Sequence, residues 1–87
     1  MPVVILRAPL KDLAGGNHEL TFEGAHVRDV VRALEAEWPK TIGWVLDEQG
    51  RVRQHVNVFL NGERVREDAA VGPSDTLHIL ASITGGS

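Results

Sequence analysis

The pattern of hydrophobic and polar residues near the start of the chain predicts two strands. Val3–Leu6 are four consecutive aliphatic residues, typical of a strand buried on at least one face, and Pro9 closes the segment. A second segment follows, in which Leu20 and Phe22 alternate with polar residues. The glycines and asparagine at 15–17 are turn residues, so the two segments are predicted to form a hairpin.

The period of the pattern changes after residue 26. Apolar residues then recur three and four positions apart, which is typical of one face of an amphipathic helix, and Pro39 ends the pattern. Positions 41–46 are compatible with a further short helical turn, and 47–54 are mostly polar and predict a loop. The apolar residues of the main helix are Val27, Val30, Val31, Leu34 and Trp38.

Strict alternation returns in the last third of the chain. Val56, Val58 and Leu60 share one face of a predicted strand, and an Asn-Gly dipeptide at 61–62 favours a tight turn into a short strand at 63–65. A last strand at 76–81 completes the order strand, strand, helix, strand, strand, strand. This order predicts the α+β class and a β-grasp architecture, with a mixed sheet of four to five strands and one main helix packed on one face.

Composition narrows the class of protein. The 87 residues form one domain, 43% hydrophobic and 24% charged. The net charge of -3 and the pI near 5.7 argue against a nucleic-acid partner. The first apolar segment is too short for a signal peptide or a membrane span, so we expect a cytoplasmic protein without a membrane partner. There is no cysteine, which excludes disulfides, zinc thiolates and a nucleophilic thiol.

No residue constellation indicates catalysis or metal binding. His18, His26, His55 and His78 are scattered over predicted turn, helix, loop and strand without a pair four residues apart on one helix. The acidic residues near 63–68 have no nucleophile and base beside them. We therefore assign no catalytic residue and no metal ligand, and expect the protein not to be an enzyme.

Four segments resemble the ubiquitin-like sulfur-carrier family: "RAPLKDLAGG", "FEGAHVRDVVRALEAEWP", "HVNVFLNGERV" and "DTLHILASITGG". This family includes the small subunit of molybdopterin synthase and the sulfur carriers of thiamine and cysteine biosynthesis. The resemblance runs from the first strand to Gly86. It implies a β-grasp domain at 1–82 and a flexible diglycine tail, with one extra residue, at 83–87.

The resemblance implies a chemical role for Gly86. In this family a ubiquitin-activating-type enzyme uses ATP to adenylate the glycine carboxylate, and a sulfur donor converts the adenylate to a thiocarboxylate for a sulfur-accepting biosynthetic enzyme. Ile83, Thr84 and Gly85 would then thread the partner's active site, and the two glycines would give the end of this arm a backbone without side chains. The protein would be a monomeric substrate when free, with no bound cofactor of its own, since ATP belongs to the adenylating enzyme.

Ser87 conflicts with this role, because it holds the carbonyl of Gly86 in an amide that cannot be adenylated. One hypothesis is that Gly86 and Ser87 form a processing site and that a metalloprotease of the JAMM type removes Ser87. The alternatives are a residue added in cloning, a deliberately blocked terminus, or a family member that never carries sulfur.

Two other functions fit the same sequence. The first is a protein modifier that forms isopeptide bonds through Gly86, for which Lys11 and Lys40 are the only lysines available for self-conjugation. The second is an interaction module that has lost the chemistry. The sulfur acceptor also stays open among molybdopterin, thiamine, cysteine, a thiolated nucleoside and a secondary metabolite, although the loop at 47–55 resembles the cysteine-biosynthesis branch.

Strand alternation predicts a docking surface. If the valines and Leu60 of the third strand face the helix, Phe59 and Leu80 point to the outer face of the sheet, where large apolar residues in water mark an interface. The adenylating and acceptor enzymes are the expected partners; a covering loop or a homodimer contact is the alternative. The first strand adds either Val3 and Ile5 or Val4 and Leu6, and Ile5 is included in the predicted patch.

A basic cluster precedes the third strand. Arg51, Arg53 and His55 lie close together in the sequence. They are compatible with a solvated loop or with a surface that complements an acidic partner.

Overall fold

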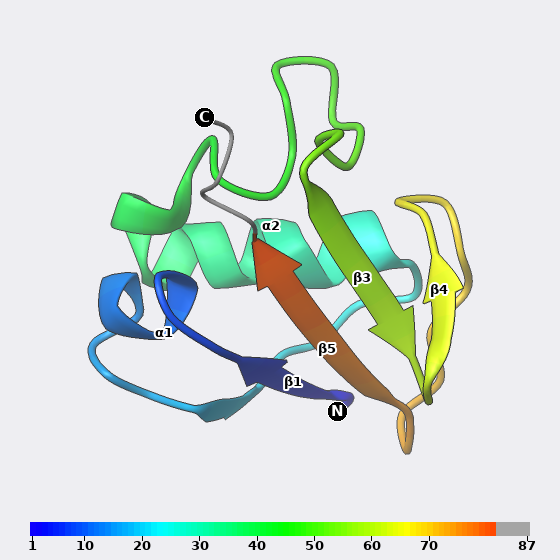
Figure 1. The fold of residues 1–87 in the computed structure, drawn as a ribbon. Coiled ribbons are helices and arrows are strands. Elements are labelled where there is room, and N and C mark those ends of the chain that lie inside the picture. Colours follow the sequence, from blue (N-terminus) through cyan, green and yellow to red (C-terminus); the bar gives the residue numbers. More distant parts are fainter. Residues whose placement is uncertain (82–87) are drawn as a thin grey trace.

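A five-stranded mixed sheet with one long helix across one face makes up the protein (Figure 1). The computed structural model describes residues 1–81. The strand order is β2-β1-β5-β3-β4. The elements are β1 (Val3–Leu6), α1 (Leu10–Leu13), β2 (Glu19–Thr21), α2 (Val27–Glu37), the 3-10 helix η1 (Pro39–Thr41), β3 (Val56–Leu60), β4 (Glu63–Val65) and β5 (Thr76–Ala81).

The last strand lies at the centre of the sheet. β5 pairs in parallel with β1 on one side and antiparallel with β3 on the other. β2 and β4 are the edge strands, each antiparallel to its hairpin partner. The α+β class, the mixed sheet and the number of strands are as predicted from the sequence.

The helix α2 is fixed at both ends. The carboxylate of Asp29 accepts a hydrogen bond of 3.1 Å from the backbone N–H of His26, which satisfies one donor before the first turn. At the other end the backbone N–H of Trp38 donates to the carbonyl of Leu34 at 2.8 Å, and Pro39 begins η1. Of the apolar residues predicted for this helix, four are buried in the core, whereas Trp38 follows the last helical residue and is only partly buried.

The core lies between α2 and the inner face of the sheet. Val58, Leu77 and Ile79 are buried on that face as the alternation predicts, whereas Leu60 is partly buried at its margin. In β1 the buried residues are Val4 and Leu6, so Val3 and Ile5 belong to the outer face. The structure thereby decides between the two pairs that the sequence left open.

Two short helical segments differ from the prediction. α1 was not predicted, because four residues are too few for a periodic pattern; it forms where Leu10 and Ala14 enter the core. The helical turn expected at 41–46 lies earlier, at 39–41, because Pro39 suits the first position of a helix and the hydroxyl of Thr41 donates to the carbonyl of Trp38 at 2.7 Å.

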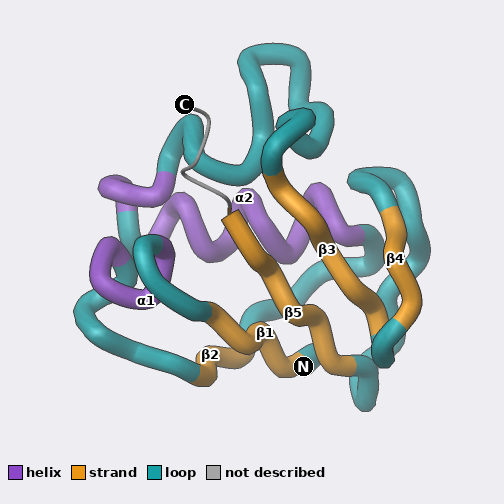
Figure 2. The backbone as a smooth tube through the Cα atoms, in the orientation of Figure 1, coloured by secondary structure: helices purple, strands orange, loops and turns teal. Residues whose placement is uncertain are grey.

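The segment after η1 was predicted to be mostly a connection, but it is well anchored. Val45, Leu46 and Val52 are buried in the core, and Leu46 and Val52 pair across a single β-bridge. The loop between these two bridged residues rises above the start of β3 (Figure 2). Buried apolar residues at its base hold this loop against the domain.

Polar contacts fix the same loop internally. The carboxylate of Asp47 accepts backbone hydrogen bonds from Arg51 at 3.0 Å and from Gln49 at 2.8 Å. These N–H groups, that of Arg51 first, hold the pKa of Asp47 below its ordinary value. The turn therefore has a defined conformation.

Two neighbouring elements also hold the loop. Arg28 of α2 donates from Nε to the carbonyl of Gly50 at 3.1 Å. Glu67, which follows β4, accepts a hydrogen bond of 2.8 Å from the backbone N–H of Val52, and this bond lowers the pKa of Glu67. The loop is thus attached to both the helix and the edge of the sheet.

The helices in the described part of the chain are shorter than the roughly 20 residues that a membrane span needs. The longest, α2, has 11 residues. Over residues 1–81, no helix combines the length and the apolar character that crossing a membrane requires.

Candidate functional site

The predicted reactive segment lies beyond the described chain. Ile83, Thr84, Gly85, Gly86 and Ser87, to which the sequence assigns sulfur transfer, tail threading and processing, all fall outside residues 1–81. Ala81, the last residue of β5, is therefore the point from which that segment leads. We call Ala81 and the residues around it the tail base.

The tail base is defined by its cross-strand partner. Ala81 pairs with Val56, the first residue of β3. Residues 53–55, which lead into β3, consequently lie beside the end of β5. Figure 1 shows the end of β5 close to the loop that precedes β3.

The predicted docking residues do come together on the outer face of the sheet. His78 in β5 lies opposite Ile5 in β1 and opposite Phe59 in β3, so the three side chains form one row across the central strands. Leu80 is two residues further along β5 on the same face, toward the tail base. We call Ile5, Phe59 and Leu80 the outer patch.

The outer patch is more sheltered than the sequence suggested. Phe59 and Leu80 were expected to stand in water, yet both are half-buried, as is Ile5. Neighbours on adjacent strands cover much of each side chain, because directly opposed residues in a sheet lie only about 5 Å apart. His78, at the centre of the row, was not predicted as part of this surface, although its place between Leu77 and Ile79 implies it.

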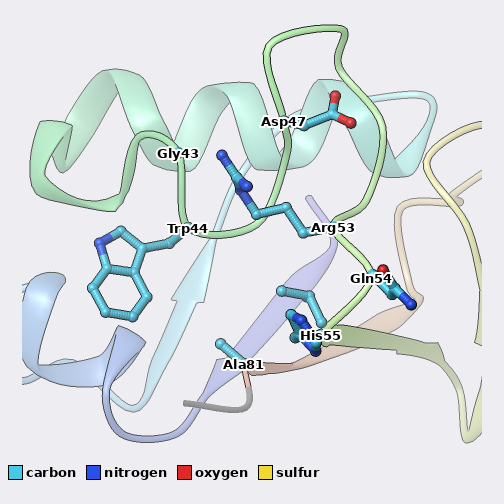
Figure 3. Close-up of a pocket in the computed structure, with 8 residues that line it drawn as sticks. Gly43, Trp44, Asp47, Arg53, Gln54, His55 and Ala81 are labelled. Carbon is cyan, nitrogen blue, oxygen red and sulfur yellow. The ribbon is translucent and has the colours of Figure 1, made fainter. Parts of the chain in front are cut away.

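A groove of about 440 Å³ opens on the other side of the tail base (Figure 3). Trp44 lies at one side of it, and the side chain of Arg53 extends toward the backbone of Gly43 and Trp44. We call it the tail-base groove. Its lining residues are Gly43, Trp44, Asp47, Arg53, Gln54, His55, Val56 and Ala81.

Sequence reasoning missed Trp44. A turn places it at the surface: its backbone N–H donates to the carbonyl of Thr41 at 3.0 Å, and Gly43 has a φ of +87° that favours glycine. Ile42 and Trp44 have exposed fractions of 61% and 36%. The available signal was an Ile-Gly-Trp tripeptide that fits neither the helix pattern nor the polar loop.

The four histidines do not form a metal site together. Within residues 1–81, no three histidine or carboxylate side chains are close enough to hold a metal ion. His18 contacts the carbonyl of Leu6 at 3.1 Å and His26 contacts the carboxylate of Asp29 at 3.3 Å. The first contact joins the residue before β2 to the end of β1, and the second lies within the first turn of α2.

The strand order, the single long helix and the strand that leads from the centre of the sheet into a diglycine define a ubiquitin-like β-grasp protein of the carrier and modifier class. The chain belongs to the ThiS family, whose model matches residues 4–86. The matched region includes both glycines and stops before Ser87.

Known relatives agree with this class. Small archaeal modifier protein 3 of Haloferax volcanii is 35% identical over 68 residues, which cover 74% of this chain and 73% of that protein. The crystal structure of SAMP1 from Haloferax volcanii has a TM-score of 0.80 at 28% identity, with 98% of each chain covered.

A third relative comes from a complex. A chain of the Amycolatopsis orientalis BexX/CysO complex has a TM-score of 0.88 at 26% identity, covering 99% of this chain and 100% of that one. The sulfur-carrier resemblance and the predicted β-grasp fold are therefore confirmed.

Proposed function

We propose that this protein is a sulfur carrier whose reactive group is the carboxylate of Gly86. The observation that carries the proposal is the extent of the family match, which reaches Gly86 and ends there. A diglycine that follows the central strand of a β-grasp sheet presents a carboxylate on a backbone without side chains, which a narrow active site can accept.

The chemistry requires activation, because a free carboxylate is a poor acyl donor. An oxygen of the Gly86 carboxylate attacks the α-phosphorus of ATP on a ubiquitin-activating-type enzyme, and pyrophosphate leaves. A hydrosulfide-level sulfur donor then attacks the acyl carbon, AMP leaves, and the thiocarboxylate remains. The thiocarboxylate supplies its sulfur to a biosynthetic enzyme. In this scheme ATP is bound by the partner, and the carrier is a substrate.

Cleavage of the Gly86–Ser87 bond comes first in the proposed sequence. Ser87 follows Gly86, so the carbonyl of Gly86 is part of an amide and offers no carboxylate. Hydrolysis of this bond by a processing protease, for which a metalloprotease is our candidate, liberates the group that is adenylated.

The outer patch is the proposed docking surface for both enzymes. Ile5 and Phe59 flank His78, and Leu80 continues the apolar surface toward the tail base. Clustered apolar side chains on one sheet face favour association with a partner. A partner that covers this face is also placed to receive the residues that follow Ala81.

A protein modifier is the second candidate. It is favoured by one observation, the 35% identity to a protein named as a small archaeal modifier. In that function the adenylate is attacked by a lysine amine of a target, which gives an isopeptide bond through Gly86. Both candidates need the same first step.

ATP–pyrophosphate exchange tests that first step. The chain ending at Gly86 is mixed with the adenylating enzyme of its native host, labelled pyrophosphate and ATP. We expect exchange with this chain and none with the 87-residue chain, which differs only by Ser87. Addition of sulfide should then replace one oxygen by sulfur in the intact mass. Equal exchange with both chains, or none with either, would contradict the proposal.

A further inference from the structure

The tail-base groove is separate from the outer patch, and it differs from that patch in chemistry. The outer patch is apolar, whereas the groove combines the indole of Trp44 with Arg53, Gln54 and His55. Such a mixture of an aromatic surface and polar groups suits a peptide segment that carries both an apolar and a charged side chain.

The charged groups of the groove favour an acidic occupant. Arg51 and Arg53 are exposed, and neither forms an ion pair within the described part of the chain. Asp47 also lines the groove, and the charges of Arg51 and Arg53 help to lower its pKa, but among the described residues neither arginine lies within ion-pair distance of its carboxylate. Glu48 lines a neighbouring hollow that Asp47 and Arg53 also line, but within residues 1–81 it forms no ion pair with Arg53. Arg53 is left as a cation that a partner's carboxylate can pair with.

The groove is preorganised for binding. The loop that carries Arg53 is anchored by Arg28, by Glu67 and by buried Val52. The backbone N–H of Arg53 also donates to the carbonyl of Val45 at 2.9 Å. Little ordering is needed before association, so more of the contact energy appears as affinity.

The position of the groove identifies which protein covers it. Gly86 lies five positions after Ala81, and an extended chain of five residues reaches at most about 18 Å. An enzyme that holds the carboxylate of Gly86 therefore has its surface beside the tail base. Adenylation is the step shared by the carrier and the modifier, so the adenylating enzyme is the partner to expect here.

We infer that the tail-base groove binds an acidic segment of the adenylating enzyme, with a carboxylate on Arg53 and an apolar side chain against Trp44. The inference rests on the proposed function, because it takes its partner from that function. It adds a second, charge-specific contact on the opposite side of the tail base from the outer patch. The two contacts together would orient the tail toward the enzyme's active centre.

Binding without ATP tests the groove by itself. Titration calorimetry measures the Kd of the host's adenylating enzyme for the chain ending at Gly86 and for its variants. We expect Arg53→Glu and Trp44→Ala each to raise the Kd about tenfold, as for loss of a charge pair or an anchor. Lys40→Glu is the matched control: it makes the same change in net charge, Lys40 is exposed, forms no ion pair within residues 1–81 and does not line the groove, and the Kd of this variant should stay within about twofold.

Further measurements separate this inference from the proposed function. The increase in Kd caused by Arg53→Glu should become smaller at high salt. Replacing the contacting acidic residue of the enzyme by lysine should restore binding to the Arg53→Glu variant. If Arg53→Glu and Trp44→Ala both bind with the Kd of the unmodified chain, or if the unmodified chain does not bind, the inference that the groove contacts the adenylating enzyme is wrong. Binding that depends on Arg53 without any pyrophosphate exchange would instead overturn the proposed function. Circular dichroism confirms that each variant is folded.

Discussion

Phe59 of β3 lies directly opposite His78 of β5, and Ile5 of β1 lies on the other side of His78. Apolar side chains from two strands therefore flank a histidine on the central strand. The row ends at Glu19 on one edge strand and Arg64 on the other. This arrangement gives the outer face apolar side chains around His78 and charged residues at its borders, and a polar rim of this kind is usual in a protein–protein interface.

Phe59→Asp tests the docking role of this face. The side chain is half-buried, and Arg64 opposite can pair with the new carboxylate, so we expect a stability loss below about 2 kcal/mol. Pyrophosphate exchange should fall about a hundredfold in kcat/KM, the loss typical of a hot-spot aromatic. Thermal unfolding and exchange assays measure the two effects.

Thr21→Asp is the matched control for Phe59→Asp. Thr21 lies on the edge strand β2 opposite Val3, outside the outer patch. The substitution therefore introduces the same charge at a site where no docking is expected. Its exchange rate should stay near that of the unmodified chain. A Phe59→Asp variant that exchanges as fast as Thr21→Asp would show that partners dock elsewhere.

Gly15 and Gly16 provide a matched pair for the packing of Trp38. Both have positive φ, of +70° and +80°, but an added Cβ at Gly15 would lie 2.7 Å from Cη2 of Trp38, whereas Gly16 has open space. Gly16→Ala should cost about 1 kcal/mol for its backbone conformation. Gly15→Ala should cost about 3 kcal/mol, because overpacking is added. Equal losses in urea unfolding would show that the indole moves aside freely.

Asp75 should make stability depend on pH. Its carboxylate accepts hydrogen bonds from the side-chain amide of Asn61 at 2.9 Å and from the backbone N–H of Gly72 at 2.7 Å, and these hold its pKa below the ordinary value of 3.8. A lowered pKa in the folded state stabilises the protein above the unfolded pKa, and this contribution is lost as the pH falls through the folded pKa.

Asp75→Asn isolates this contribution. The variant should have a lower Tm than the unmodified protein near neutral pH, and the difference should narrow as the pH falls below about 4. Asp47 and Glu67 also have lowered pKa values, so both proteins should still lose stability in acid. A Tm difference that does not change with pH would mean that the carboxylate charge of Asp75 contributes nothing.

Much of the fold could be predicted from the sequence, because its main elements have strong periodic patterns. Alternation placed Phe59 and Leu80 on the outer face, and the spacing of Val27, Val30 and Leu34 defined α2. Patterns of this kind are local, and burial in the folded protein agrees with them.

The segment between α2 and β3 could not be predicted in the same way. The loop after buried Val45 is held by Arg28 of α2 through Gly50 and by Glu67 through Val52, and both holding groups are distant in the sequence. The register that brings Val56 opposite Ala81 is likewise a tertiary property. Consequently the basic cluster around Arg53 was recognised from the sequence, but its place beside the tail base was not.

The intact mass of the untagged protein recovered from its native host tests the central claim most directly. It reports processing and terminal chemistry together, since both alter the same end of the chain. We predict a species that lacks Ser87, together with a form in which one oxygen is replaced by sulfur. A single species that still carries Ser87, unchanged when the host's sulfur pathways are induced, would contradict the account.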